Sequence, residues 1–430
     1  MRPTRRTTLS VLAIASSAIV STGCGSGSTS SPGGAGHYDP SAGAAGDDGT
    51  STASSSGGSA APAPGPGGTT PTAMDDAGTT ADASALDPRV VDYGEALRTA
   101  SLKLVGNLPT LAQIQAIEAA TTPAAQATIY DADVDAMLAD PRFASQMIQY
   151  FRDTFKTGMP YSPMPKGAPS FDTAATFAAM VVVNEQPFTD ILTAATGTCP
   201  TFANGTFTAA SCTNNAPTSG VLTDPGIQAQ YFEDLAFRRV RFIQEIFVCS
   251  PMPAEYSANP VPMGQSLYTS PWPFDSIAGG PTANINFQDT SAVICANCHT
   301  TLNHIAPLFA YFDANGKYQT TIQVQTPIVP PVTSVLTDWL PAGQGFAWRN
   351  GVPVTDIPSL GQAIAADPDV AQCAVNRVWD WAFNRGDIVN DLATIPAEVT
   401  APVVTDFTAK QMNLKQAIRD IFTSDDFVRF

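Results

Sequence analysis

The sequence predicts a mainly α-helical protein, with short strands or extended loops, that follows a disordered N-terminal tether. Three observations predict this fold class. Apolar residues recur at helical spacing through much of 87–430, small and polar residues dominate the chain before it, and 320–357 combines prolines with β-branched runs. The 430 residues allow two or three domains, and a hydrophobic content of 44% is sufficient for a core.

Residues 1–23 have the features of a lipoprotein signal peptide. Three arginines among the first six residues precede the apolar stretch Leu9–Val20, which is too short to span a membrane. Small residues then lead into Cys24, which resembles the acylated cysteine of the bacterial lipobox. We expect Cys24 to carry a lipid that anchors the protein to a membrane, and plain cleaved secretion is the alternative.

The segment 24–86 is predicted to be a disordered, low-complexity tether. From Gly25 to about Leu86 the chain is mostly Gly, Ser, Ala, Thr and Pro, with scattered Asp and no Lys or Arg. Such a composition cannot bury enough apolar surface to offset the entropy of ordering. A flexible chain of this length reaches roughly 40–50 Å, so the tether would separate the folded part from its anchor.

We divide the folded part into a helical domain at 87–250, a loop-rich segment at 251–345 and a C-terminal helical domain at 346–430. Helical spacing of apolar residues, with start signals such as Thr110 and Pro141, predicts the helices of both helical domains. These helices are Val90–Val105, Leu111–Ile117, Asp131–Leu138, Pro141–Thr157, Gln228–Phe247, Ser359–Ala366, Asp369–Phe383 and Leu414–Phe422.

For two of these helices, the pattern also predicts which side chains are buried and which face solvent. The helix at 141–157 has one apolar stripe that we expect to lie in the core. The helix at 228–247 alternates apolar with charged residues, and its arginines are expected to form a solvated or ion-paired face. The stripe consists of Phe143, Met147, Tyr150, Phe151 and Phe155, and the arginines are Arg238, Arg239 and Arg241.

The charge balance and the scarcity of histidine exclude two classes of function. The chain has 21 Lys and Arg against 38 Asp and Glu, a net charge of -17, and 3 His. Nucleic-acid binding needs a basic patch that meets the phosphates, so no nucleic-acid partner is expected. A Ser/His/Asp triad would have to use His304, and no nucleophile-elbow pattern accompanies it.

The sharpest signal is the run Cys295-Ala296-Asn297-Cys298-His299, which has the spacing that attaches c-type haem. Two thiols three residues apart can form thioethers to the two vinyl groups of the porphyrin. The adjacent imidazole of His299 then binds the iron as its proximal ligand. We therefore expect one covalent haem c, and 251–345 becomes a haem-binding segment that contains a cytochrome c-like helical part.

Three other interpretations of this run stay open. A zinc site would need further ligands, and only His304 is near. A thioredoxin-like redox pair would need an alternating strand and helix pattern that this chain lacks. A disulfide between Cys295 and Cys298 is possible in an oxidising compartment, but it leaves the adjacent histidine unexplained.

The four remaining cysteines form an even set in a compartment where disulfides persist. Cys199 and Cys212 bracket 12 residues, and closing a loop of this size is worth about 3 kcal/mol. This pairing is the first choice among three connectivities. Cys249 and Cys373 would then join the long helix to a C-terminal helix, and two free buried thiols are the alternative.

The sixth iron ligand is less defined than the proximal one. Met412 is the only methionine after the motif, and Met263, which precedes it, is the candidate we favour. An open or water-bound site is the alternative, and such a site would admit small molecules or peroxide.

Asp313, Asn315 and Gly316 resemble the start of a calcium loop, but its terminal acidic residue is missing, so we expect a turn.

Most of 89–430 resembles the planctomycete-type cytochrome-associated domains of exported proteins from planctomycetes and myxobacteria. The resemblance rests on Asn297-Cys298-His299 with Ile305, Pro307, Phe309, Tyr311-Phe312-Asp313 and Gly316-Lys317-Tyr318, on 220–253, and on Trp379-Asp380-Trp381-Ala382-Phe383-Asn384-Arg385. The chain departs from the family at Asn303-His304-Ile305-Ala306, which replaces Asp-Pro-Ile-Gly, and at Gln319, where Arg is common. The resemblance implies a haem-bearing, mainly helical exported protein. Gly25 follows Cys24 where enteric lipoproteins retained in the inner membrane carry Asp, so by resemblance to those lipoproteins we expect an outer-membrane destination.

The sequence thus predicts an exported, lipid-anchored c-type haem protein that transfers single electrons at the cell envelope, with a redox partner protein that it does not identify. An electron carrier is favoured over an enzyme. One alternative is a structural or binding surface lipoprotein whose CxxC is oxidised or metal-bound. Another is a haem enzyme of peroxidase type with an open sixth site.

Overall fold

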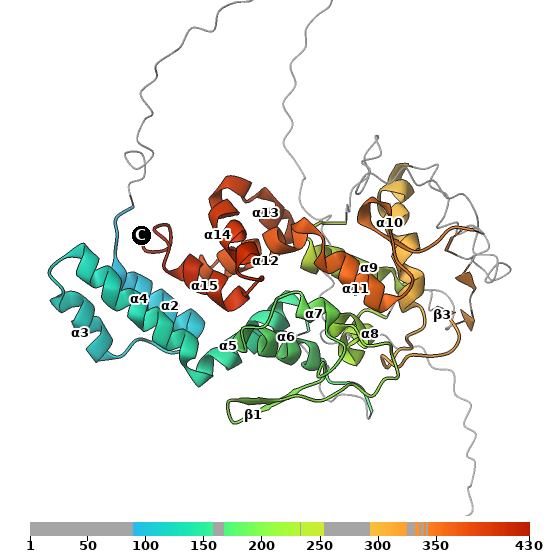
Figure 1. Cartoon of the computed structure of the whole chain (residues 1–430), viewed down its shortest axis with the longest axis horizontal. Coiled ribbons are helices and arrows are strands. Elements are labelled where there is room, and N and C mark those ends of the chain that lie inside the picture. Colours follow the sequence, from blue (N-terminus) through green and yellow to red (C-terminus); the bar gives the residue numbers. More distant parts are fainter. Residues whose placement is uncertain are drawn as a thin grey trace, which may run out of the picture. The chain divides into compact units, whose positions relative to one another are not determined.

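A computed structural model describes residues 89–157, 167–232, 234–252, 293–324, 332–333, 335–336, 339–340 and 343–430. At 234, 293–298, 300, 323–324, 332–333, 350 and 393 it describes the backbone alone. The described residues belong to one compact unit with fourteen α-helices and a few short strands (Figure 1), which confirms the mainly α-helical fold class. The predicted signal peptide and tether, with Cys24, and the candidate ligand Met263 lie outside the described residues.

The described part of the chain begins with four helices, and the sequence predicted the start signals Thr110 and Pro141 of two of them; the helix predicted at Asp131–Leu138 begins earlier, at Pro123. Thr110 forms a capping box with Gln113, and proline occupies the first position of the next two helices. Asp92 caps the first helix by accepting from the amides of Gly94 and Glu95. The helices are α2 (Tyr93–Leu104), α3 (Leu111–Ala119), α4 (Pro123–Ala139) and α5 (Pro141–Thr154).

The apolar stripe of α5 is buried, as predicted, because α5 packs against α6 (Thr173–Val183). Helix α6 was not predicted, because it is apolar nearly all round and has no amphipathic period. After α7 (Asp190–Thr193) a short antiparallel hairpin pairs β1 (Thr201–Ala203) with β2 (Thr206–Thr208). Asn204 and Gly205 form its tip with φ of 52° and 76°, as a tight hairpin turn requires.

The predicted single helix at 228–247 is wrong. The structure has α8 (Pro225–Gln230), the 3₁₀ turn η2 (Asp234–Ala236) and α9 (Phe237–Phe247) in its place, preceded by the 3₁₀ turn η1 (Gly220–Thr223). The break lies at Leu235 and Ala236, whose φ angles of 56° and 66° are left-handed and end any α-helix.

The predicted solvated or ion-paired arginine face is wrong for one of its three members. Arg241 is exposed and pairs with Glu245 at 2.7 Å, as expected. Arg238 lies over the ring of Tyr231, 5.9 Å from its centroid. Arg239, however, is only 2% exposed, because backbone carbonyls of other segments surround its guanidinium.

The segment predicted to be loop-rich contains a helix of 17 residues, α10 (Val293–Phe309), with Pro307 near its end. Short extended pieces follow it, as the proline-rich sequence predicted. β3 (Gln323–Val324) pairs with β4 (Val332–Thr333), and β5 (Ala347–Trp348) pairs with β6 (Val352–Pro353) across the 3₁₀ turn η6 (Arg349–Gly351); both pairs are antiparallel.

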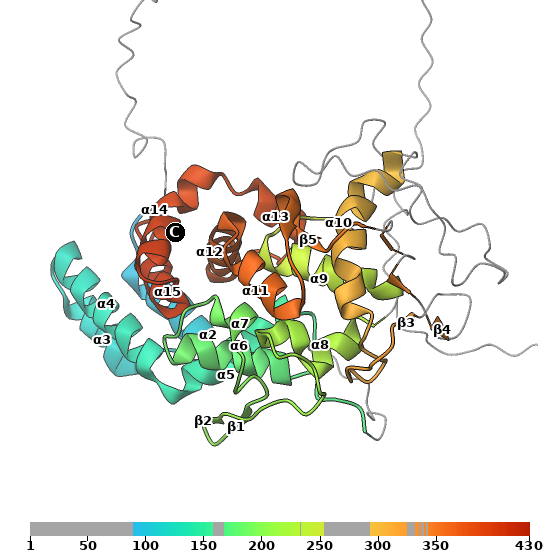
Figure 2. The ribbon, with the colours of Figure 1, turned by 45° about the vertical axis from the view of Figure 1, so that its right-hand side comes forward.

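Five helices complete the chain, and the sequence predicted the first, second and fifth of them. α12 (Pro368–Ala382) packs against α14 (Ala397–Ala409) and α15 (Leu414–Phe422), as Figures 1 and 2 show, and it also contacts α9. One cluster of buried apolar side chains extends from Ala96 to Val428 through all of these helical groups. The predicted domain boundaries therefore stay predictions. The helices are α11 (Ile357–Ala365), α12 (Pro368–Ala382), α13 (Val389–Thr394), α14 (Ala397–Ala409) and α15 (Leu414–Phe422).

Candidate functional site

The run Cys295 to His299 lies on α10, beside α9 (Figures 1 and 2). A helix turns about 100° per residue, so positions 295, 298 and 299 share one face of α10. The structure describes the backbone of the two cysteines and the side chain of His299. The helical backbone thus brings the three positions of the predicted haem motif together.

His299 is half-buried and contacts two side chains of the described chain. Its Nδ1 lies 3.2 Å from Oδ1 of Asn303, one helical turn further on. Its ring meets the ring of Phe237 edge to face, with centroids 4.8 Å apart and planes at 85°. Burial lowers the pKa of His299, and the hydrogen bond with Asn303 opposes this shift.

The hydrogen bond between His299 and Asn303 selects a tautomer. The amide oxygen of Asn303 can only accept, so Nδ1 carries the proton and donates it. Nε2 is then the nitrogen with the basic lone pair, which is the nitrogen that a proximal haem ligand presents to iron. In the sequence, Asn303 stands out only as a departure from the family pattern, although its spacing of four residues from His299 already places it on the adjacent turn.

Arg239 fixes the far end of α10. Its Nη1 donates to the carbonyl of Phe309 at 2.7 Å, and its Nε donates to the carbonyl of Gln228 at 3.1 Å. The last carbonyls of a helix lack partners within the helix and carry partial negative charge, so a cation is favourable there. The rings of Phe232 and Phe312 flank the guanidinium at 5.3 and 5.7 Å. Burial lowers the pKa of Arg239 to about 9.

Helix α9 therefore contacts α10 near the motif through Phe237 and at its end through Arg239. Helix α9 is itself held by α12. Arg377 donates to the carbonyls of Ile246 and Glu245 at 3.1 and 2.6 Å, at the end of α9. The disulfide between Cys249 and Cys373 joins the residue two positions after α9 to α12. The position of the motif helix thus depends on contacts between residues seventy or more positions apart in sequence.

His304 is 4% exposed and lies on the same helix as His299. Five residues rotate a helix by about 140° beyond a full turn, so the two imidazoles leave α10 in different directions. Because both side chains come from one helix, His304 cannot approach an iron from the side opposite His299. The two imidazoles of α10 therefore cannot bind one iron from opposite sides.

The predicted turn after α10 is confirmed. Asp313 Oδ1 accepts from the amides of Asn315 and Lys317 at 2.8 and 3.0 Å, and Oδ2 accepts from Nε2 of Gln319 at 2.7 Å. Gln319, a departure from the family pattern, thus holds the carboxylate that organises the turn.

Asn214 connects this turn to the segment that follows Cys212. Its Nδ2 donates to the carbonyls of Thr223 and Gly316 at 2.8 and 3.1 Å, and its backbone carbonyl accepts from the amide of Tyr318 at 2.9 Å. Gly316 has a φ of 69°, and a Cβ there would lie 2.0 Å from the carbonyl oxygen of Pro225. The turn after α10 therefore lies directly against the chain near α8.

The structure contains two disulfides, Cys199–Cys212 and Cys249–Cys373, the two pairs that the sequence analysis favoured. Disulfides persist in oxidising compartments, so they indicate a location outside the cytoplasm. Among the described helices, none is both long enough and apolar enough to cross a membrane. The one described group of three side chains with metal-binding donors is Cys199, Cys212 and Asp224, and the disulfide leaves it no thiolate.

Comparisons with models of protein families, with curated proteins and with solved structures gave no match to this chain.

Proposed function

We propose that this protein is an exported, lipid-anchored c-type haem protein that transfers single electrons at the cell envelope. The observation that carries the proposal is the CxxCH run on one face of α10, with Nδ1 of His299 directed to Asn303. The two disulfides support it, because c-type haem is joined to protein outside the cytoplasm. Membership of the planctomycete-type cytochrome-associated domain family is part of the proposal.

In this proposal each residue of the site has a distinct part. Cys295 and Cys298 would hold the porphyrin through thioether bonds, and Nε2 of His299 would bind the iron. Asn303 keeps the proton on Nδ1, and the ring of Phe237 limits rotation of the imidazole. When bound, the haem supplies an iron that cycles between two oxidation states one electron apart.

The residues that the structure describes fit such a group. The backbone places the two cysteines and the histidine on one face, and Asn303 selects the tautomer that iron ligation needs. Burial disfavours protonation of His299, which keeps the imidazole neutral and able to bind a metal. Cys24 would tether this site to the membrane through the lipid.

The test is production of the full chain in a bacterial periplasm that contains the machinery for c-type haem attachment. We expect haem that stays with the polypeptide under denaturing conditions and gives the pyridine haemochrome spectrum of a c-type haem. The double variant Cys295→Ala/Cys298→Ala should lose covalent haem. The matched control Cys199→Ala/Cys212→Ala, which also removes two thiols, should keep it.

The spectra of the loaded protein separate the carrier from the enzyme. Low-spin spectra that become high-spin in Met263→Ala, and not in Met252→Ala, would support electron transfer with a methionine as sixth ligand. High-spin spectra of the unaltered protein with turnover of peroxide would support a peroxidase. A colourless protein with Cys295 and Cys298 oxidised or metal-bound would overturn the haem proposal and favour a structural or binding lipoprotein.

A further inference from the structure

The two disulfides differ in their access to solvent. Cys249 and Cys373 are buried, with exposed fractions of 9% and 1%. Cys199 and Cys212 are half-buried, and they close the loop that carries the β1–β2 hairpin. The thiol of another molecule must reach a sulfur to exchange with it, so of these two disulfides only Cys199–Cys212 is open to such chemistry.

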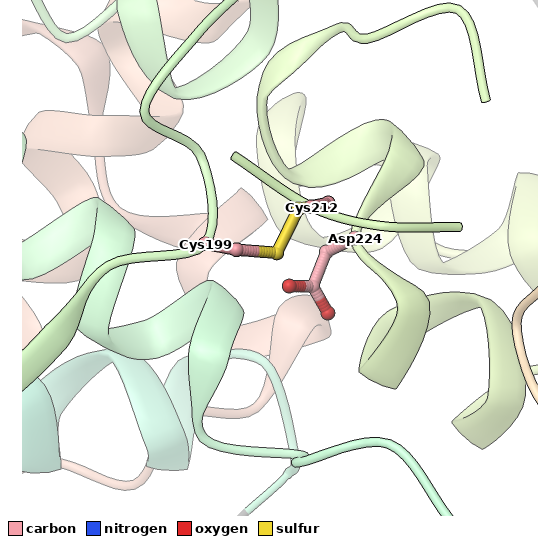
Figure 3. A group of neighbouring side chains, drawn as sticks. All are labelled: Cys199, Cys212 and Asp224. Atoms are coloured by element: carbon pink, nitrogen blue, oxygen red, sulfur yellow. A yellow bond between two sulfur atoms is a disulfide. The ribbon is translucent and has the colours of Figure 1, made fainter. Parts of the chain in front are cut away.

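A buried carboxylate accompanies the accessible disulfide. Asp224 is fully buried, and one of its oxygens and the sulfurs of Cys199 and Cys212 all lie within 4.8 Å of one another (Figure 3). Its Oδ1 accepts from the amide of Ile227 at 2.9 Å and so caps α8. Its Oδ2 has no hydrogen-bond partner among the described residues.

Capping a helix does not explain this arrangement. Asp92 and Asp356 cap α2 and α11 in the same way from exposed positions. Asp224 makes the same bond in a closely packed place, where a Cβ on Gly226 would lie 2.3 Å from the carbonyl oxygen of Ser170. Burying a carboxyl with an oxygen that has no partner costs free energy, so a role beyond the cap is expected.

Cys199 is one of the residues that line a cavity of about 350 Å³. Its charged lining residues are Arg152 and Asp172, which pair with each other at 2.8 Å. Its other lining residues include Thr201 and Phe202 of the hairpin. An attacking thiol can therefore approach Cys199 from the cavity.

We propose that Cys199–Cys212 is a thiol–disulfide exchange site for a dithiol reductant, with Asp224 as the proton donor to the sulfur that leaves. A thiolate of the reductant attacks Sγ of Cys199, the S–S bond breaks, and Cys212 leaves with the electron pair and takes the proton of Asp224. The second thiol of the reductant then attacks the mixed disulfide and releases Cys199, which takes its proton from solvent. The reductant departs as a disulfide, and two electrons pass to the protein.

The ionisation of Asp224 agrees with this role. Burial raises the pKa of Asp224 to about 7, and hydrogen bonds from the backbone of Ile227 and Gly226 oppose the shift. A carboxyl that titrates near neutral pH can both give and regain a proton there. The charged groups that line the approach to the disulfide, Arg152 and Asp172, neutralise each other. The inference does not depend on haem.

The test follows the reduction of both disulfides in the full chain, with Cys249–Cys373 as an internal control. Samples treated with dithiothreitol are alkylated at intervals, and mass spectrometry reports each cysteine. We expect Cys199–Cys212 to be reduced first. The rate of reduction of Cys199–Cys212, divided by the concentration of dithiothreitol thiolate, should fall as the pH rises through about 7, because Asp224 then loses the proton it donates.

Asp224→Asn should slow this reduction by about 10-fold or more and remove the pH dependence. Asparagine caps a helix as well as aspartate does, so α8 should be kept. Asp92→Asn, the same change at an exposed cap, should leave the rate unaltered. The proposal is overturned if the two disulfides are reduced at equal rates. It is also overturned if the reduction rate in the unaltered protein depends on pH only through the thiolate concentration of dithiothreitol. Both outcomes can be read even if the variant fails to fold.

The source of the dithiol is a separate outcome of the same assay. Dithiothreitol represents a small-molecule dithiol, and a reduced protein of the thioredoxin class represents a protein dithiol. If the thioredoxin-class protein reduces Cys199–Cys212 at a lower concentration than dithiothreitol does, the natural reductant is a protein. If neither reduces it faster than Cys249–Cys373, there is no exchange site.

Discussion

Removing each disulfide in turn should destabilise the protein by different amounts. The change is the pair Cys249→Ala/Cys373→Ala in one variant and Cys199→Ala/Cys212→Ala in the other. A disulfide restricts the unfolded chain, and the restriction grows with the logarithm of the loop it closes. The two loops span sequence separations of 124 and 13 residues and do not overlap, so the two effects can be compared directly.

The chain-entropy relation gives about 5 kcal/mol for the long loop and about 3 kcal/mol for the short one. The structure adds to this difference. Cys249 and Cys373 lie in the core and join α9 to α12, so alanine there also leaves a small cavity, whereas the other pair is half-buried. We therefore expect the first variant to lose at least about 2 kcal/mol more than the second.

The assay is guanidinium-induced unfolding of the full chain, followed by circular dichroism at equal protein concentration. The free energies come from linear extrapolation, and equal slopes for the variants would show that the same surface is exposed. Tryptophan fluorescence as a second probe tests whether unfolding is two-state. If Cys199→Ala/Cys212→Ala loses as much stability as the other variant, the loop-length reasoning is refuted.

Three further predictions concern single side chains. Arg239→Met should lower the free energy of unfolding by about 2–6 kcal/mol in denaturant titrations, because the buried carbonyls of Gln228 and Phe309 lose their donor and each costs about 1–3 kcal/mol when left unpaired. Exposed Arg241→Met should cost under about 1 kcal/mol. Asn303→Asp should lower the reduction potential of the haem-loaded protein in redox titrations, because a charged acceptor makes the ligating imidazole a stronger donor, and Asn315→Asp on the exposed turn should change it less. Asp224 binds its proton more tightly in the folded than in the unfolded chain, so its contribution to the free energy of unfolding is lost as the pH rises from about 4 to about 7. Asp224→Asn should flatten that part of the profile of unfolding free energy against pH, measured in urea.

The parts of the fold that the sequence predicts are those encoded locally. Helix α15 begins and ends where its apolar period predicts, and α3 begins directly after the predicted start signal Thr110. The missed helix α6 is buried on nearly every side, so its sequence has no polar face that could reveal a period.

The break between α8 and α9 could not be predicted from the pattern. Apolar residues continue at helical spacing through Leu235 and Ala236, and neither residue favours a left-handed conformation. Contacts made after folding decide the outcome. The carbonyls that receive the guanidinium of Arg239 come from Gln228 and Phe309, and the second of these is 70 residues away in sequence.

The positions of the candidate haem site could be chosen from the sequence, whereas the contacts that surround them could not. The spacing of Cys295, Cys298 and His299 indicates haem attachment without any structure. The contact of Phe237 with His299 joins two segments that are far apart in the chain, so no local pattern contains it. Likewise, only the folded chain shows that Asp224 lies beside a disulfide.

The bonds of Asn214 determine where this chain can accept extra residues. They fix the spacing between Thr223 and the turn at Gly316, so an insertion on either side would pull the turn after α10 away from α8. The hairpin tip at Asn204 and Gly205 is exposed and bears no such bonds to other segments in the described structure. A peptide tag or a fluorescent reporter inserted at that tip should leave the motif helix in place, which offers a way to follow the protein in living cells.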